Sequence, residues 1–422
     1  MMAVNRVGRI GEKIMRTKST GMRALLAGIL ALGLATAAQA QQEVKLGAFV
    51  TLSGISADVG AQMKAGIEVA IERIAPDFKI NGVQTPIRVI WYDDEGKGDT
   101  GLNVVTRALT VDKITAGVGF LSSDVFIRVM DEFQKASTPI VTCCSASLKI
   151  GAKIAEQKMN YVFQLSPTAK DVATSVIAAV ATLQKPSKVV MLNENTDAGR
   201  DFSQISRDWL KANAPGIEVV SDDFVPRGVP DLTPQLAKFK RLGAGAIVGE
   251  VYGTAAPVLF QQWNELRVPA MIAHMGTSAA ADSFVAEHGA EMEGSLVNVR
   301  WIPGKYTDLS EPMVEAYKKK TGFSPSTFAV QAHDATLVTL EAIRAAGSTD
   351  PAKVAAAMES GTFTGAWGQR HFTPLAEGHR MPVETIVVQI QNGKKVVVYP
   401  PAVAEGQGGH YKPVPPWGWE KK

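Results

Sequence analysis

Cysteine is nearly absent from this chain. Only two of the 422 residues are cysteine, and they are adjacent, at Cys143 and Cys144. Neighbouring cysteines cannot join distant segments, so the fold does not rest on the disulfide framework that is common in small secreted proteins. The pair is either two free thiols or a strained vicinal disulfide. We favour buried free thiols, because free cysteine behaves as a small apolar residue.

The loops that enzymes and nucleotide-binding proteins use are also missing. No G-x-G-x-x-G follows the first predicted strand, no G-x-x-x-x-G-K-[ST] occurs, and no G-x-S-x-G marks an α/β hydrolase. His333-Asp334 falls on a predicted helix, where neighbouring residues do not share a face, so we do not interpret it as a catalytic pair. We therefore expect a protein that is not an enzyme and that binds no cofactor.

Metal-ligand patterns are scarce. The six histidines include no H-E-x-x-H pair. The acidic cluster Asp93-Asp94-Glu95 follows a predicted strand and could hold a cation, but acids at a strand end more often form a solvated turn. We expect no metal site.

Long apolar runs are confined to the N-terminus. The segment Met22–Ala40 has Arg23, an apolar run from Ala24 to Ala38, and the small-residue ending Ala38-Gln39-Ala40. This run is shorter than the roughly 20 residues of a membrane span, and the whole pattern is typical of a cleaved signal peptide. We predict a signal peptide over residues 1–40 and export to the periplasm.

The basic charge of the chain belongs to this leader. Residues 1–40 carry six Lys or Arg and one acid, so the net charge of +3 becomes −2 for the remaining 382 residues. No basic surface for nucleic acid is expected. A chain of this length is typical of two domains.

Strand-like and helix-like segments alternate along the body of the chain, a pattern that predicts an α/β fold with mostly parallel sheets flanked by helices. In the first unit, predicted strands alternate with predicted helices: Val44–Val50, Gly60–Ile74, Ile87–Tyr92, Asn103–Val111, Ala116–Phe120, Ser123–Gln134 and Pro139–Cys143. A second unit of the same kind begins near Tyr161. Helices at 311–321, 326–346 and 351–359 and a strand pair about Asn392-Gly393 follow it, and a Pro- and aromatic-rich tail closes the chain.

Small hydroxyl residues follow three strands of the first unit. They lie in Thr51-Leu52-Ser53-Gly54, Leu121-Ser122-Ser123 and Cys144-Ser145-Ala146-Ser147. Ligands of open α/β sheets bind outside the carboxyl ends of the strands, and hydroxyls beside the free N–H groups of a helix start suit a carboxylate. Serine is also an ordinary helix N-cap, so a small-anion site and plain capping both stay open.

These segments resemble the type I periplasmic solute-binding proteins of ABC transporters, in the branched-chain amino-acid (leucine/isoleucine/valine-binding) group. No single motif is diagnostic, but their order and spacing are similar over nearly the whole chain after the leader. The matching segments are Leu52-Ser53-Gly54, Asp93-Asp94, Gly119-Phe120-Leu121-Ser122-Ser123, Ser145-Ala146-Ser147, Phe163-Gln164-Leu165-Ser166-Pro167, Asp197-Ala198-Gly199, Gly228-Val229-Pro230-Asp231, Gly253 and Asp334-Ala335.

The resemblance implies a two-lobe clamshell that closes on a small solute and then docks on an ABC permease, most often as a monomer. The three hinge crossings would lie near Tyr161, Val299 and Phe372. One lobe would be residues 41–161 plus 300–371, the other residues 162–299 plus 372–400, with residues 401–422 as the tail. A sensor subunit for a membrane signalling protein is an alternative use of the same fold.

The resemblance also implies which residues hold the ligand. In this family the carboxylate is bound by first-lobe hydroxyls and N–H groups, which fall on Ser122, Ser123, Ser145, Ala146 and Ser147, with Leu52 and Ser53 at the rim. Cys144 would line the pocket, and Tyr252 and His274 could supply polar contacts.

Two positions differ from the amino-acid-binding pattern. Ala198 stands where these proteins usually have a tyrosine over the ligand, and Val229 stands where they often have an acid for the ligand ammonium. A buried ammonium without a partner is costly. Either Glu250 replaces the missing acid and the ligand is a branched-chain or other amino acid, or the ligand has no ammonium. We favour a small organic acid, aromatic or branched aliphatic.

Overall fold

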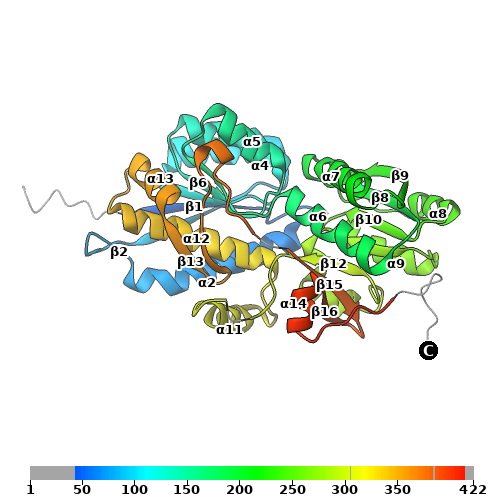
Figure 1. Ribbon diagram of the computed structural model, residues 1–422. Coiled ribbons are helices and arrows are strands. Elements are labelled where there is room, and N and C mark those ends of the chain that lie inside the picture. Colours follow the sequence, from blue (N-terminus) through cyan, green and yellow to red (C-terminus); the bar gives the residue numbers. More distant parts are fainter. Residues whose placement is uncertain (1–42, 305, 384, 414–422) are drawn as a thin grey trace, which may run out of the picture. The chain divides into compact units, whose positions relative to one another are not determined.

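The computed structural model describes residues 43–304, 306–383 and 385–413. The predicted signal peptide and the last part of the predicted tail, residues 414–422, lie outside these described residues. None of the described helices is both long and apolar enough to cross a membrane. From Val44 onward the chain builds two separate central sheets with their helices (Figure 1).

The first sheet has five parallel strands in the order β4-β1-β5-β6-β7. Their bounds are β1 (Val44–Val50), β4 (Ile87–Asp93), β5 (Ala116–Gly119), β6 (Ile140–Thr142) and β7 (Val162–Gln164). Strand β1 is apolar on both faces because helices cover both faces of a parallel sheet. Helices α2 (Ala57–Ile74) and α12 (Thr327–Ala346) pack on one face, and α3 (Gly98–Arg107), α4 (Ser123–Lys135) and α5 (Leu148–Gln157) on the other.

The second sheet has seven strands in the order β16-β15-β12-β11-β10-β8-β9. The bounds are β8 (Lys188–Glu194), β9 (Glu218–Val225), β10 (Ala246–Glu250), β11 (Met271–His274), β12 (Leu296–Val299), β15 (Ile386–Gln391) and β16 (Lys394–Tyr399). Only β15 and β16 are antiparallel to their neighbours. One face is covered by α6 (Ala169–Ala179) and α7 (Asp197–Asn213), the other by α8 (Thr233–Leu242), α9 (Ala255–Glu265) and α10 (Asp282–His288).

The chain passes between the two sheets three times. It does so between β7 and α6, between β12 and α11 (Ser310–Thr321), and between the hairpin β13 (Thr362–Gly365)–β14 (Gly368–His371) and β15. Helix α13 (Pro351–Ser360) packs on α12. The α/β fold with two mostly parallel sheets and three crossings is thereby confirmed, while the residue boundaries of the lobes stay a prediction.

Two smaller parts complete the described chain. A short hairpin joins β2 (Lys79–Ile80) to β3 (Val83–Gln84). After β16 the sequence predicted a Pro- and aromatic-rich tail, and within it a helix, α14 (Pro401–Gly406), packs on β16. Beyond it, the side chain of Gln389 exchanges two hydrogen bonds with the backbone of Lys412, which fastens the chain to β15.

Candidate ligand-binding cleft

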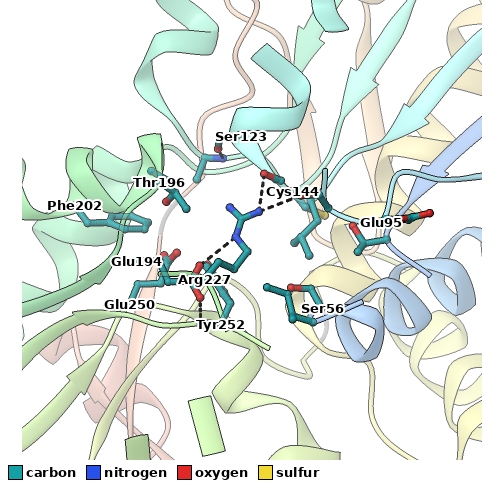
Figure 2. Close-up of a pocket in the computed structure, with 17 residues that line it drawn as sticks. Ser56, Glu95, Ser123, Cys144, Glu194, Thr196, Phe202, Arg227, Glu250 and Tyr252 are labelled. Carbon is teal, nitrogen blue, oxygen red and sulfur yellow. Dashed lines mark hydrogen bonds and ion pairs between the residues drawn. The ribbon is translucent and has the colours of Figure 1, made fainter. Parts of the chain in front are cut away.

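A cavity lies where the carboxyl ends of strands from both sheets meet, and it holds about 620 Å³ of empty space counted out to its mouth. Every segment that lines it follows a strand, as expected for an open α/β sheet. Figure 2 shows the side chains converging from both sheets. The lining residues are Thr51, Ile55, Ser56, Glu95, Gly96, Leu121, Ser122, Ser123, Cys144, Ala146, Glu194, Thr196, Ala198, Phe202, Arg227, Glu250 and Tyr252.

The N-terminal ends of four long helices meet at this cavity. Ser56 precedes α2, Ser122 caps α4, Ala146 lies just before the cap of α5, and Thr196 caps α7. Each helix N-terminus carries unsatisfied N–H groups and a partial positive charge. Four of them around one cavity favour an anion.

Ser123 organises the first-sheet side of the cavity. Its Oγ accepts hydrogen bonds from the backbone N–H groups of Ala146 and Ser147, both at 3.1 Å. A ligand carboxylate placed here could receive the Ser123 hydroxyl and these two N–H groups together. Ser145 instead donates its hydroxyl to the carbonyl of Phe120, which ties the loop after β6 to the loop after β5.

Among the residues that the structure describes, Arg227 is the only basic one that lines the cavity, and the sequence analysis did not identify it. It lies in the loop after β9, with its side chain among the pocket residues (Figure 2). Its guanidinium donates to Glu194 at 3.4 Å on its own side and to Ser122 Oγ at 3.3 Å across the cleft. A further ion pair with Asp124 spans 3.5 Å. These distances are long for charge-assisted hydrogen bonds, so the guanidinium is free to exchange them for a ligand anion.

Two buried carboxyl groups face Arg227 from β8 and β10. Glu194 accepts from the backbone N–H of Tyr252 at 3.0 Å, and burial raises its pKa although that bond and Arg227 oppose the shift. Burial, helped by the nearby charge of Glu194, raises the pKa of Glu250 well above its ordinary value, against the charge of Arg300. Oε2 of Glu250 has no hydrogen-bond partner among the described residues. Burial thus favours the neutral form of Glu250.

Beside the cavity, the loop after β10 is in direct contact with the loop after β1. Gly253, which follows Tyr252, has φ +53°, and a Cβ built there would lie 1.8 Å from the carbonyl oxygen of Ile55. The neighbouring N–H of Thr254 donates to that same carbonyl at 3.2 Å. The structure is thus closed over the cavity, and only glycine fits at this contact.

Of the predicted ligand residues, the structure brings seven together around the cavity. They are Ser122, Ser123, Cys144, Ala146, Ala198, Glu250 and Tyr252. Six predicted residues do not line it: Leu52, Ser53, Ser145, Ser147, Val229 and His274.

Those six have other partners or surroundings. Leu52 N–H donates to Asp93, Ser53 is exposed, and Ile55 and Ser56 take their place at the cavity. Ser147 Oγ donates to Asp201 on α7, outside the cavity, at 2.7 Å. Val229 packs against the apolar cluster under α8 and α9.

His274 is a buried packing residue. Its two ring nitrogens lie 2.8 Å from the carbonyl of Gly276 and 2.9 Å from that of Val251, which leaves none for a ligand. Burial lowers the pKa of His274 although both hydrogen bonds oppose that shift.

The acidic cluster Asp93-Asp94-Glu95 and the pair His333-Asp334, which we assigned neither to metal binding nor to catalysis, have structural roles. Asp94 accepts from Thr51 Oγ1 and from Gly96 N–H, so the acidic cluster forms a hydrogen-bonded turn. Asp334 binds His333 and the backbone N–H groups of Ala366 and Trp367, holding the β13–β14 turn against α12. No group of potential metal ligands occurs among the residues that the structure describes.

Two α/β lobes around a cavity ringed by helix N-termini define a type I solute-binding protein. The sequence profile of the periplasmic binding protein family matches residues 43–395, so the chain belongs to that family. It is a family of binding proteins rather than enzymes.

A curated relative is the Leu/Ile/Val-binding protein homolog 7 of Brucella suis biovar 1 (strain 1330), which is 24% identical over 90% of this chain and 97% of its own length. Among solved structures, the LivJ substrate-binding protein of Streptococcus pneumoniae with isoleucine has a TM-score of 0.75 at 21% identity, over 85% of this chain and 99% of that chain. A solute-binding protein of an ABC transporter from R. palustris with benzoate has a TM-score of 0.74 at 16% identity, over 84% of this chain and 95% of that chain. These two likenesses show the fold.

Proposed function

We propose that this protein is the periplasmic solute-binding component of an ABC importer, and that it captures a small organic acid, aromatic or branched aliphatic, for delivery to a membrane permease. The lobes are residues 41–161 plus 300–371 and residues 162–299 plus 372–400. The protein acts as a monomer, and its two lobes close on the solute. One observation carries the ligand class: four helix N-termini and Arg227 converge on one cavity with a largely apolar wall.

The carboxylate of the ligand would bind on the side of the cavity formed by the first sheet. The Ser123 hydroxyl and the N–H groups of Ala146 and Ser147 already form a small hydrogen-bonded cluster there. A carboxylate that replaces the Ser123 oxygen as acceptor gains these donors and the positive ends of α4 and α5. Arg227 adds a full positive charge from the opposite sheet.

The body of the ligand meets apolar and aromatic groups. Ile55, Leu121, Ala198, Phe202 and Tyr252 line the cavity between the polar ends. Ala198 contributes only a methyl group at the N-terminus of α7, which leaves space for a ring or a branched chain. An apolar wall with a few convergent polar groups is the usual design of small-molecule sites.

Three glutamates line the cavity among the described residues, and each is less suited to a ligand ammonium than a free carboxylate would be. Glu95 pairs with Lys97 at 2.8 Å. Glu194 is occupied by Arg227 and by the N–H of Tyr252. Burial raises the pKa of Glu250 well above its ordinary value, which favours its neutral form. An amino acid would have to ionise Glu250 on binding and would then release its proton.

The second candidate is an amino-acid receptor of the same transporter class. The unpartnered Oε2 of Glu250 favours it, since that atom could accept from a ligand ammonium. The solved neighbours do not decide, because the isoleucine-bound and the benzoate-bound proteins match this chain almost equally well, with TM-scores of 0.75 and 0.74.

A thermal-shift screen of matched pairs tests the proposal. The protein is stripped of carried-over solute by partial unfolding and dialysis, then melted with leucine or 4-methylpentanoate, phenylalanine or 3-phenylpropanoate, and benzoate. A solute at 100 times its Kd adds about 2.7 kcal/mol of stability. We expect shifts from acids without an amino group. Shifts from leucine or phenylalanine alone would establish the amino-acid receptor instead.

A further inference from the structure

The two cysteines lie in the wall of the cavity and face each other. They follow β6, where Cys143 N–H donates to the carbonyl of Gly119. Successive side chains of an extended chain point to opposite sides. Here the chain bends, and the two Sγ atoms are in contact at 2.6 Å. Both thiols are free in this structure.

The two thiols differ in their access to the cavity. Both belong to the apolar cluster between the first sheet and α12, and Cys143 is fully buried there. Cys144 is 3% exposed and lines the cavity, so the cavity is the route to its sulfur. Burial raises the pKa of the Cys144 thiol well above its ordinary value, which disfavours the reactive thiolate in this conformation. An opening of the lobes would admit water and oxidant to Cys144 first.

We propose that Cys143 and Cys144 form a reversible vicinal disulfide, and that an oxidant enters through the solute cavity. The inference rests on the proposed function for the oxidising compartment and for the opening of the cleft. Its test needs no solute, so its failure and the failure of the proposed function are distinguishable.

The bond would be labile because the two residues are adjacent. Neighbouring Cα atoms are about 3.8 Å apart, whereas most disulfides join Cα atoms at about 4.4–6.8 Å. A disulfide between neighbours is therefore strained, and strained disulfides are the ones that exchange readily. The cysteine pair is therefore better suited to reversible oxidation and reduction than to a permanent cross-link.

The oxidant is a disulfide compound, such as oxidised glutathione or a protein disulfide. The thiolate of Cys144 attacks one sulfur of that disulfide, releases one thiol and forms a mixed disulfide. The thiol of Cys143 loses its proton and attacks the sulfur of Cys144, which releases the second thiol. Two electrons and two protons have then passed from the cysteine pair to the oxidant.

The test exposes the reduced, folded protein to oxidised glutathione and then counts free thiols by alkylation under denaturing conditions and mass spectrometry. The wild-type protein should lose both thiols and the mass of two hydrogen atoms, without any glutathione adduct. Dithiothreitol should restore both thiols.

Two single variants test the route through the cavity. C143S keeps the thiol at the cavity wall and should gain one glutathione. C144S keeps only the core thiol and should gain none while folded, which a melting curve checks.

Two outcomes would overturn the proposal. In the first, C143S is modified but the wild-type protein keeps two free thiols or carries a stable glutathione adduct, which shows that Cys143 does not close the ring. In the second, C143S is not modified, or C144S is modified equally, which shows that the cavity is not the route.

Discussion

Replacing Arg227 by glutamine should abolish most of the affinity for an anionic solute. Arg227 is the one cation in the described part of the cavity wall, and a hydrogen bond to a charged group contributes about 1.5–3 kcal/mol. Since about 1.4 kcal/mol corresponds to a tenfold change in Kd, R227Q should weaken binding roughly 10- to 150-fold. R227K keeps the charge without the planar fork and should lose less.

The same change has a cost in the empty protein that must be measured separately. R227Q leaves the buried carboxyl of Glu194 without its cation, but protonation of Glu194 limits the loss because burial already raises its pKa. The apo melting temperature reports this cost, while calorimetric titration with the best acid of the screen reports the Kd.

The matched control is R207Q. Arg207 also pairs with an acid, Asp222 at 2.6 Å, but does not line the cavity, so the Kd should not change. A folded R227Q protein that binds the acid with wild-type affinity would refute the reasoning and leave Arg227 as a contact between the lobes only.

Three further predictions concern the cavity. A198Y fills space beside α7 and should weaken binding of aromatic acids at least tenfold in calorimetric titration. E250Q should raise the free energy of unfolding in urea at neutral pH and have little effect below about pH 4.5. The pKa of Glu250 is higher in the folded protein than in the unfolded one, because burial penalises its ionisation only in the fold. The wild-type protein therefore loses stability as the pH rises from the unfolded pKa through the folded pKa. An equal effect of E250Q at both pH values would contradict this. G253A should impair closure and weaken binding, whereas G243A, with a similar positive φ but no atom near the added Cβ, should only lower the melting temperature.

Much of the fold could be predicted because a local sequence pattern is enough to identify many of its strands and turns. The run Val44–Val50 is apolar except for Lys45 and is observed as β1 with the same bounds. The Asn392-Gly393 turn was also identifiable, since both residues adopt positive φ. Helix α5 was missed, because it is short and Gly151 interrupts its apolar residues. Helix α14 was missed because it is short and lies in a segment rich in proline and glycine.

The candidate site could be predicted only in part. Ser122 and Ser123 were identifiable because they follow a strand and precede a helix, although the same position suits a helix N-cap, which Ser122 also is. Arg227 gave no such signal, since a charged residue in a loop is ordinarily solvated, and only the approach of the two sheets places it at the cavity. Val229, two residues later, turns into the apolar cluster instead. Which residue of a loop faces a cleft is a tertiary property.

Calorimetric titration of the stripped protein with 3-phenylpropanoate and with phenylalanine, each in two buffers of different ionisation enthalpy, tests the ligand class most directly. The account predicts that 3-phenylpropanoate binds at least tenfold more tightly, with no proton released, because Glu250 stays neutral. Tighter binding of phenylalanine, with release of a proton that E250Q abolishes, would contradict it and assign the cleft to an amino acid.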